Sequence, residues 1–280
     1  MRDKKIAKDL AIENNIKSKQ DWEEVTVREN LGRKLYIHRF NSEKQTIVLM
    51  GDEHIGSKFY DEKEHMKNLE WCFKYDVPII LMGDELETAT KTSVGAGVFE
   101  QDEIVQGQLE KAVKIYKPFA DKKLLLGNHI GNHEARVFNH SGANLSKILS
   151  TLLKIPYLGV GAVHYLKIGK ENYTLYTTHG SSGARLAHTK IANTLKLAEM
   201  IDAEIYAQGH LHQLTHHTKN YYSVDKRKKS IIESQKHFII TGNYLTHWGS
   251  YAHVKGYEPA RKGSPKLKLS GLEHQIRVSL

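Results

Sequence analysis

Short apolar runs alternate with longer amphipathic stretches from residue 35 onward. The apolar runs predict strands at residues 35–40, 46–50, 78–82 and 124–126. Between them, apolar positions recur at helical spacing and predict helices at residues 62–75, 104–116 and 144–153. The first half of the chain is therefore predicted to alternate β and α elements.

The pattern changes toward the carboxyl end of the chain. A hairpin is predicted from strands at residues 163–168 and 173–178, and a helix at 189–201 leads into a strand at 204–207. Three further candidate strands follow at residues 221–224, 231–232 and 237–241. Strands flanked by helices, followed by antiparallel pairs, predict an α/β fold in which two sheets pack together with helices outside.

Residues 1–40 are predicted to form an amino-terminal helical arm, and residues 41–280 a single domain. Residues 5–14 have helical spacing, and residues 18–22 have the composition of a turn into another helix. A small helix-turn-helix for DNA is conceivable, but we favour a helical arm packed on the main domain.

The composition is that of a globular protein. Its apolar runs are at most about eight residues long, whereas about 20 are needed to span a bilayer. The first 15 residues are charged throughout and have no apolar core of the signal-peptide type. The single cysteine, Cys72, excludes an intrachain disulfide and fits a reducing compartment. We expect a soluble cytoplasmic protein.

The chain carries a surplus of positive charge. Lys and Arg number 41 against 32 Asp and Glu, a formal net charge of +9. Such a surplus attracts polyanions. The basic residues are densest at 226–229, and five more lie between 255 and 268. Each stretch is either a polyanion contact or a solvated loop.

Five short polar segments each lie at or near the end of an apolar run. They are Gly-Asp-Glu-His at 51–54, Gly-Asp-Glu at 83–85, Gly-Asn-His-Glu at 131–134, Thr-His-Gly at 178–180 and Gly-His-Leu-His at 209–212. Groups at the carboxyl ends of successive strands can meet at one sheet edge. Carboxylate, amide and imidazole groups are the ligands that a two-metal phosphoesterase requires. The five segments therefore predict a site for two divalent ions.

Local spacing suggests how the ligands are presented. Asp52 and His54 are two residues apart, so an extended chain would direct both side chains to the same side, and His210 and His212 repeat this spacing. Asp84 ends its own strand and is a candidate to bridge the two ions. Glycines directly before Asp52, Asp84, Asn132 and His210 would let the backbone turn sharply.

The ordered set resembles the calcineurin-like metallophosphoesterase superfamily, whose pattern is GDxH, GDxx, GNH(D/E), a later His and GHxH. The match covers roughly residues 47–245. The resemblance implies a four-layer αββα sandwich of two mixed β-sheets flanked by helices. Residues 93–98 and 179–183 are similar to members that we associate with bacteriophages, which would place the protein in a host cytoplasm.

The resemblance also implies residue roles. It implies that Asp52, His54 and His212 hold one ion, that Asp84 bridges both, and that Asn132, His179 and His210 complete the second site. His133 would contact the substrate phosphate and protonate the leaving oxygen, while a metal-bridging hydroxide attacks phosphorus. Mixed oxygen and nitrogen ligands suit Mn²⁺, which we favour, or Fe or Zn²⁺.

Two features depart from the family pattern. The third motif occurs twice, at Asn128-His129 and at Asn132-His133. We favour the second copy, because only there does an acidic residue, Glu134, follow the histidine. In the second motif Glu87 occupies the place where many members have Asp or Asn. It is either a residue that supports the ligands or a solvated loop residue.

The predicted activity is that of a metal-dependent phosphoric ester hydrolase. The charge favours a phosphodiesterase or nuclease acting on nucleic acid or nucleotides. A phosphomonoesterase, including a protein phosphatase, is the alternative, and a metal-containing nucleic-acid-binding module a more distant one. Arg136, Arg185 and Asn243 are candidate substrate-binding residues. Substrate identity and oligomeric state are left open by the sequence.

Overall fold

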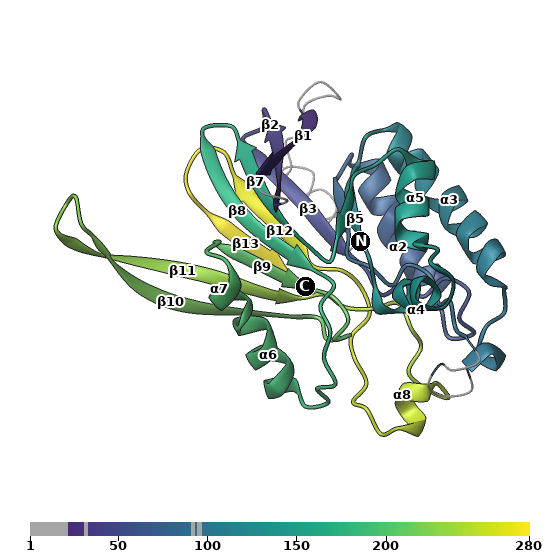
Figure 1. The fold of residues 1–280 in the computed structure, drawn as a ribbon. Helices are drawn as coiled ribbons and strands as arrows, with labels where there is room; N and C mark the ends of the chain where they lie inside the picture. Colours follow the sequence, from purple (N-terminus) through teal and green to yellow (C-terminus); the bar gives the residue numbers. More distant parts are fainter. Residues whose placement is uncertain (1–21, 31–32, 91–92, 94–96) are drawn as a thin grey trace, which may run out of the picture.

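The computed structural model describes residues 22–30, 33–90, 93 and 97–280. In these residues two β-sheets pack face to face, and helices cover both outer faces (Figure 1). This arrangement is the predicted four-layer αββα sandwich, and the predicted α/β class is confirmed. None of the described helices has the length and apolar character needed to cross a membrane.

The larger described sheet has seven strands in the order β1-β2-β7-β8-β9-β11-β10. These are β1 (Trp22–Asn30), β2 (Arg33–Phe40), β7 (Gly161–Ile168), β8 (Glu171–Thr178), β9 (Ile205–Gln208), β10 (Thr215–Asp225) and β11 (Ser230–Ile240). Strand β2 pairs in parallel with β7, and β9 pairs in parallel with both β8 and β11. The remaining pairings are antiparallel, so the sheet is mixed.

The smaller described sheet has six strands in the order β13-β12-β3-β4-β5-β6. These are β3 (Lys44–Met50), β4 (Ile79–Leu81), β5 (Leu125–His129), β6 (Tyr157–Gly159), β12 (Lys266–Ser270) and β13 (Ile276–Ser279). The four strands from β3 to β6 are parallel. Their carboxyl ends therefore lie along one edge of the sheet.

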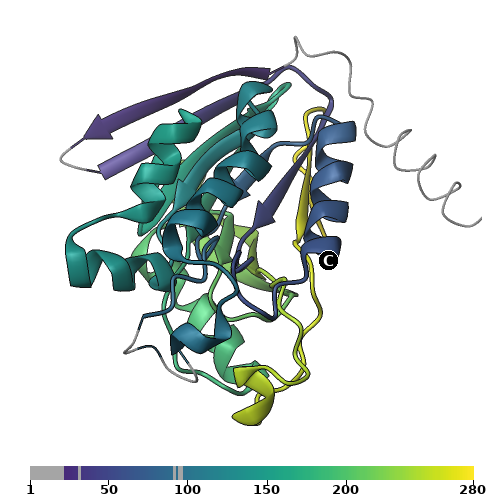
Figure 2. The same ribbon diagram turned by 90° about the vertical axis from the view of Figure 1, so that its right-hand side faces the viewer.

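The helices are divided between the two outer faces (Figures 1 and 2). Helices α2 (Glu62–Lys74), α3 (Val105–Asp121) and α5 (Leu145–Leu153) cover the six-stranded sheet, and α6 (Ala187–Leu195) and α7 (Leu197–Met200) pack on the seven-stranded sheet. Helices α4 (Asn132–Ser141) and α8 (Tyr251–Val254) lie at the lower end in Figure 1, and η1 (Gly97–Glu100) is a short 3₁₀ turn.

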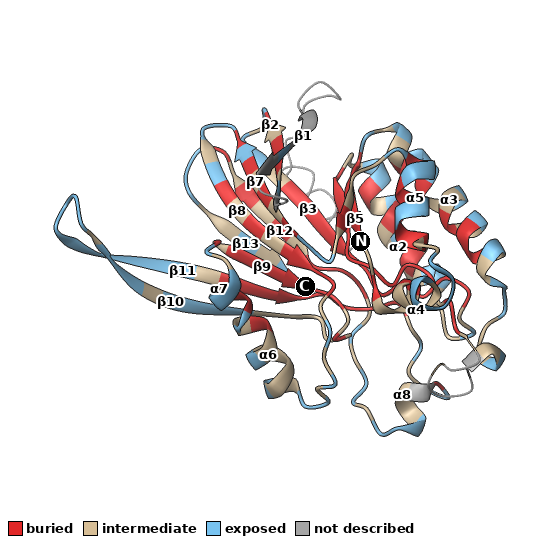
Figure 3. Ribbon diagram, in the orientation of Figure 1, coloured by how far each residue is buried: buried red, intermediate tan, exposed pale blue. Residues whose placement is uncertain are grey.

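The core follows the two-residue period of the strands. In β3, Ile47 and Leu49 face the second sheet, whereas Val48 and Met50 face the helices. Successive strand side chains point to opposite faces, so a strand covered on both faces is apolar throughout. Figure 3 shows this buried interior as two adjoining bands of red strands. The strand at residues 46–50 was predicted from this apolar run.

The helix expected to follow the turn at residues 18–22 is not found in the described residues 22–30, whereas the strand predicted at residues 35–40 is confirmed. Residues 22–30 and 33–40 form the antiparallel strands β1 and β2. The run Val25-Thr26-Val27 is β-branched and favours a strand over a helix. The helix predicted at residues 5–14 lies outside the described residues, and the domain limits 1–40 and 41–280 stay predictions.

Other differences concern element length. The candidate strands at residues 221–224 and 231–232 are parts of one long hairpin, β10–β11, whose strands have 11 residues each. The helix predicted at 189–201 is divided into α6 and α7. Helix α4 was not predicted, because its sequence is largely polar and Glu134 is its one buried residue.

A chain of buried imidazoles joins the two sheets. His38 Nε2 lies 3.0 Å from His164 Nδ1, His164 Nε2 lies 2.8 Å from Thr177 Oγ1, and Thr177 Oγ1 lies 2.7 Å from His129 Nε2. His129 Nδ1 donates to the Gly159 carbonyl at 3.0 Å, which sets the direction of every bond in the chain. Burial lowers the pKa of both His38 and His129 to about 4, so these rings are neutral at pH 7.

We expect this burial to make stability depend on pH. A histidine that titrates at 6.5 when unfolded but at about 4 when folded favours the unfolded state as the pH falls below 6.5. Between pH 7.5 and 5, His38 alone should lower the free energy of unfolding by about 2 kcal/mol. The variant His38→Gln keeps an N–H donor for His164 and cannot titrate, so it should lose about 2 kcal/mol less than wild type.

Urea unfolding at both pH values measures this difference. His188→Gln is the matched control, because His188 is exposed. It should show the wild-type pH dependence. Identical pH dependence in wild type and His38→Gln would contradict the prediction.

Candidate metal centre

The five polar segments meet at one end of the sandwich. Each lies at, or begins within two residues of, the carboxyl end of a strand, namely β3, β4, β5, β8 and β9. Backbone hydrogen bonds tie the segments together: Asp52 N donates to Gly83 O at 2.9 Å, His54 N to Asp84 O at 3.0 Å, and Gly209 N to Thr178 O at 3.1 Å. The convergence that strand order predicted is therefore present.

The ligand backbone is not extended. Asp52, His54, Asp84, His210 and His212 all have positive φ, between 48° and 65°. The expectation that Asp52 and His54, and likewise His210 and His212, share a side through an extended chain is therefore wrong. Left-handed backbone is unfavourable for non-glycine residues and clusters at functional sites. Here it turns alternate residues into the space between the segments.

Two glycines allow the second and third segments to approach closely. A Cβ at Gly131 would lie 2.1 Å from Asp84 Oδ1, and a Cβ at Gly83, whose φ is +93°, would lie 2.8 Å from Gly131 N. Close approach places the N-terminus of α4 against Asp84, where His133 N donates to Asp84 Oδ1 at 2.8 Å. A helix N-terminus favours a carboxylate.

One group of potential ligands contains Asp84, Asn132, His179 and His210. Asn132 Oδ1 lies 3.0 Å from His179 Nε2 and 2.7 Å from His210 Nδ1. Asp84 Oδ2 lies 3.3 Å from His179 Nε2 and is buried with no hydrogen-bond partner. The side chains expected at the second ion are thus together.

Backbone carbonyls determine which imidazole nitrogens carry lone pairs in this group. His179 Nδ1 donates to Met82 O at 2.9 Å, and His210 Nε2 donates to Ser182 O at 3.1 Å. In the neutral rings, the other nitrogens therefore direct lone pairs at Asn132 Oδ1 and Asp84 Oδ2. Four electron-rich atoms that face one another repel unless a cation lies among them. This donor set fits a divalent ion.

A second group contains Asp52, His54 and His212. His212 Nε2 lies 3.0 Å from Asp52 Oδ1 and 3.4 Å from His54 Nε2, and all three ligand atoms lie within 4.8 Å of one another. His210 N donates to both carboxylate oxygens of Asp52, at 3.0 and 3.1 Å. These side chains were expected to hold the first ion. Their roles as ligands stay predictions.

The electrostatic field of the site favours cations. Burial acts to lower the pKa of His179, but the carboxylates of Asp84 and Asp52 outweigh it and raise that pKa to about 10. Burial also opposes charge on His54, and Glu87, Asp84 and Asp52 raise its pKa to about 9. Protons on these rings balance the buried carboxylates, and a divalent ion would take the same place.

The two copies of the third motif lie in different surroundings. His133 Nδ1 donates to the Glu87 carbonyl at 2.6 Å, which leaves Nε2 available, 3.9 Å from Asp84 Oδ2. His129, by contrast, is buried in β5 and belongs to the imidazole chain. The structure thus brings Asn132 and His133 to the candidate ligands. His129 instead faces the other sheet, and Asn128 Nδ2 donates to the Ser146 carbonyl of α5 at 3.3 Å.

A cavity of about 340 Å³ opens onto both groups. Arg136, Arg185 and Asn243 all line it, as expected of substrate-binding residues. Arg136 Nη1 donates to Ser93 Oγ at 3.1 Å, and the Arg185 guanidinium lies 5.4 Å from the centre of the Tyr257 ring. Asn243 Nδ2 donates to the His212 carbonyl at 3.4 Å.

The burial of three glutamates beneath the site was not predicted. Glu53, Glu85 and Glu134 each directly follow a candidate site residue, and each is fully buried. They accept hydrogen bonds from Tyr116 Oη, Gly83 N and Leu86 N, respectively. Burial raises the pKa of Glu53 to about 8 and that of Glu134 to about 7. The sequence did carry a signal for them, because a glutamate directly follows Asp52, Asp84 and His133.

Glu87 orients two imidazoles rather than lying in a solvated loop. Its Oε2 lies 3.0 Å from His54 Nδ1 and its Oε1 3.5 Å from His133 Nδ1. We expect Glu87→Gln to reduce metal affinity or activity by about 10- to 100-fold, the usual effect of losing a residue that supports a ligand. Titration of the metal-free protein with Mn²⁺ measures the affinity.

The matched control is Glu258→Gln, because Glu258 lines the same cavity and is exposed. It should leave Mn²⁺ affinity unchanged. Equal affinities in wild type and Glu87→Gln would show that this carboxylate does not support the ligands.

Comparison with solved structures found similar chains at low identity. Vacuolar protein sorting 29 from Cryptosporidium parvum is 15% identical with a TM-score of 0.42, covering 85% of this chain and 98% of its own. A metallophosphoesterase from Sphaerobacter thermophilus is 13% identical (TM-score 0.35, 81% and 84% covered). A predicted phosphoesterase from Streptococcus pneumoniae TIGR4 is also 13% identical (TM-score 0.33, 84% and 93% covered).

No protein-family model matches the chain, and a search of curated proteins found no match. The resemblance to bacteriophage members stays a prediction, and residues 94–96 of the first segment behind it lie outside the described residues. In the order of its motifs and in its four-layer fold, the chain resembles the calcineurin-like metallophosphoesterases.

Proposed function

We propose that the protein is a dinuclear metal-dependent phosphoesterase that prefers phosphodiesters of nucleic acid or nucleotides. One observation carries the proposal. Two groups of ligand atoms, Asp52/His54/His212 and Asp84/His179/His210, lie at one cavity, and backbone carbonyls direct imidazole lone pairs inward in the second group. Together the two three-residue groups and Asn132 supply seven candidate ligands, whereas a closed structural site requires four.

The chain's own residues have distinct roles in this proposal. Asp52, His54 and His212 would hold one ion, Asn132, His179 and His210 the other, and Asp84 both. When bound, two divalent ions neutralise phosphoryl oxygens and acidify water. His133 presents Nε2 to the cavity, and its Nδ1–H is held by the Glu87 carbonyl. This orientation supports its role as the group that passes a proton to the leaving oxygen.

Three basic side chains line the cavity beside the acidic Asp84, Glu87, Glu100 and Glu258, and the basic ones could bind an anionic substrate. The basic ones are Arg136, Arg185 and Lys190, and a guanidinium can bind phosphate oxygens in a bidentate manner. The formal net charge of +9 supports a polyanion over a small neutral ester. The same two arginines also support the alternative, a phosphomonoesterase that grips a terminal phosphate.

Hydrolysis of a bis-aryl phosphate diester, beside the matching monoester, tests the proposal. Assays with Mn²⁺, Fe²⁺ and Zn²⁺ would use wild type and Asp84→Asn. Preference for the diester, absent from the variant, is the expected result. Preference for the monoester would favour the phosphomonoesterase. Absence of hydrolysis with every metal would contradict both and return the nucleic-acid-binding module to consideration.

A further inference from the structure

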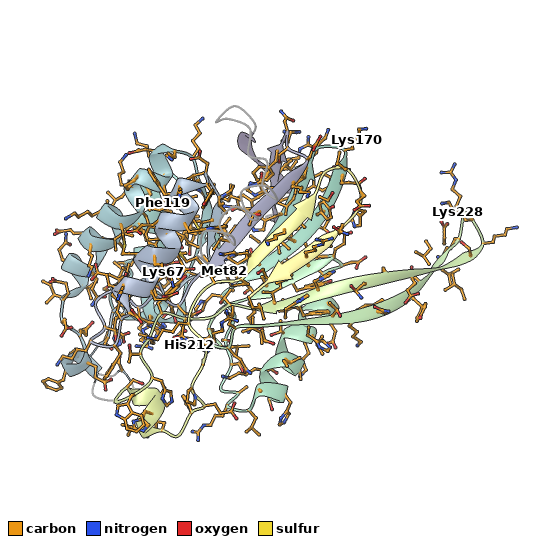
Figure 4. All side chains as sticks on the ribbon, turned by 180° about the vertical axis from the view of Figure 1, so that it is seen from behind. Lys67, Met82, Phe119, Lys170, His212 and Lys228 are labelled. Carbon is orange, nitrogen blue, oxygen red and sulfur yellow. The ribbon has the colours of Figure 1, made fainter. Side chains whose placement is uncertain are left out.

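The β10–β11 hairpin extends far beyond the sheet that holds its base (Figures 1 and 4). Only residues 237–240 of β11 pair with β9, whereas β10 and β11 pair with each other over their full lengths. We call residues 219–236 the arm. Each of its strands contributes seven paired residues, so the arm projects about 23 Å at about 3.3 Å per residue.

The turn of the arm concentrates positive charge. Lys226, Arg227, Lys228 and Lys229 are consecutive and exposed. Asp225 accepts hydrogen bonds from the backbone N–H groups of Arg227 and Lys228, both at 2.9 Å, and these bonds shape the turn. None of the four basic side chains forms an ion pair within the part of the chain that the structure describes. Their charge is therefore available to a partner.

Apolar side chains lie directly behind this turn. Val224 pairs with Ile231, and these residues are 69% and 75% exposed; Tyr222, on the same face, is 70% exposed. Glu233, opposite Tyr222, accepts hydrogen bonds from Asn220 and Tyr222. A hairpin that inserts into a membrane would lead with its apolar residues, whereas here the charged turn leads.

The base of the arm is rooted in the candidate metal centre. Strand β10 begins at Thr215, three residues after His212, and β11 ends at Ile240, directly before Thr241. Thr241 Oγ1 lies 3.5 Å from Asp52 Oδ2. Figure 4 shows Lys228 at the far end of the hairpin and His212 near its base. A partner that contacts both must extend over the length of the hairpin, and the basic turn favours a polyanion.

We propose that the arm is a binding element for duplex DNA, with its basic turn on phosphates and its apolar face in a groove. The major groove of B-form DNA admits a two-stranded β-ribbon. Each strand of the hairpin has 11 residues and spans about 36 Å, or about eleven base pairs at 3.4 Å each. The inference deepens the proposed function, and only its link to hydrolysis rests on that function.

Binding of labelled DNA measured by fluorescence anisotropy in EDTA tests the arm without hydrolysis. The arm variant carries Lys226→Gln, Arg227→Gln, Lys228→Gln and Lys229→Asn; asparagine suits the left-handed φ of 51° at position 229. The matched variant carries Lys63→Gln, Lys67→Gln, Lys114→Gln and Lys147→Gln. These lysines are exposed on α2, α3 and α5, across the molecule from the arm.

For a duplex of about 20 base pairs, the arm variant should bind at least about tenfold more weakly at low salt. The slope of log K against log salt concentration should be less negative by about 3 to 4 in the arm variant, because each lost phosphate contact changes this slope by about 0.9. The matched variant should keep the wild-type slope. A hairpin DNA with a stem of about six base pairs is too short to reach both ends, so the difference in affinity between wild type and arm variant should be smaller for it than for the longer duplex.

Equal loss of affinity in the two variants, or no loss in either, would overturn the proposal. Loss of binding to anionic lipid vesicles in the arm variant, with unchanged DNA binding, would assign the arm to a membrane surface instead. Turnover of the bis-aryl diester should be the same in the arm variant and in wild type, which reports on the metal centre independently. Absent turnover in both, with arm-dependent DNA binding, would reject the proposed hydrolysis and retain the arm.

Discussion

Replacing Asp84 with asparagine is expected to disturb both metal sites together and to lower kcat/KM by more than about 100-fold. Loss of a residue that only supports a ligand lowers activity by at most about 100-fold, and a ligand shared by both ions should matter more. Asp84 is buried, its Oδ1 accepts the His133 N–H, and its Oδ2 faces His179 Nε2 at 3.3 Å. Burial opposes its charge, but neighbouring His179 and His133 hold its pKa well below the usual range. The amide removes that charge and one lone-pair donor.

Elemental analysis of the purified protein, together with kcat/KM on the diester, measures both effects. Glu85→Gln is the matched control, because Glu85 is the adjacent buried carboxyl and its Oε1 accepts only the Gly83 N–H, a role that glutamine retains. It should keep most of the activity. Two tightly bound ions and full activity in Asp84→Asn would exclude Asp84 as the bridge.

Replacing His133 with asparagine is expected to lower turnover by about 10²- to 10⁴-fold, the usual span for a lost general acid. The reason is geometric: His133 presents Nε2 to the cavity while Glu87 holds its Nδ1–H. Metal content should change little. The loss should be greatest for diesters with poor leaving groups and small for nitrophenyl leaving groups, which need no proton.

His129→Asn is the comparison for this prediction. His129 is buried between the sheets, where it receives a hydrogen bond from Thr177 and donates to Gly159 O. Its loss should lower the free energy of unfolding, since a hydroxyl and a carbonyl lose their partner, but not change the leaving-group dependence. If His129→Asn has the kinetic effect and His133→Asn has none, the assignment of the third motif is wrong.

Local sequence was informative where one pattern dominated. The apolar run at residues 46–50 predicted a strand because both of its faces are covered, as Ile47 and Val48 show by packing into different layers. It was misleading at residues 22–30, where polar residues flank the β-branched run at 25–27 and the strand β1 that pairs with β2 was not predicted. Helix α4 was missed because it is held by tertiary contacts at Gly131 and Asp84.

The sequence by itself determined the alternation of β and α elements in the first half of the chain, the five motifs near strand ends and therefore the identity of the candidate ligands. Only the tertiary structure decided how they are presented. Positive φ at five of them replaces the expected extended geometry, and carbonyls of Met82, Ser182 and Glu87 select the imidazole nitrogens that face the cavity. These carbonyls lie 28 to 97 residues from the histidines they orient. Periodicity reports only on neighbours along the chain, so contacts of that separation exist only once both sheets have packed.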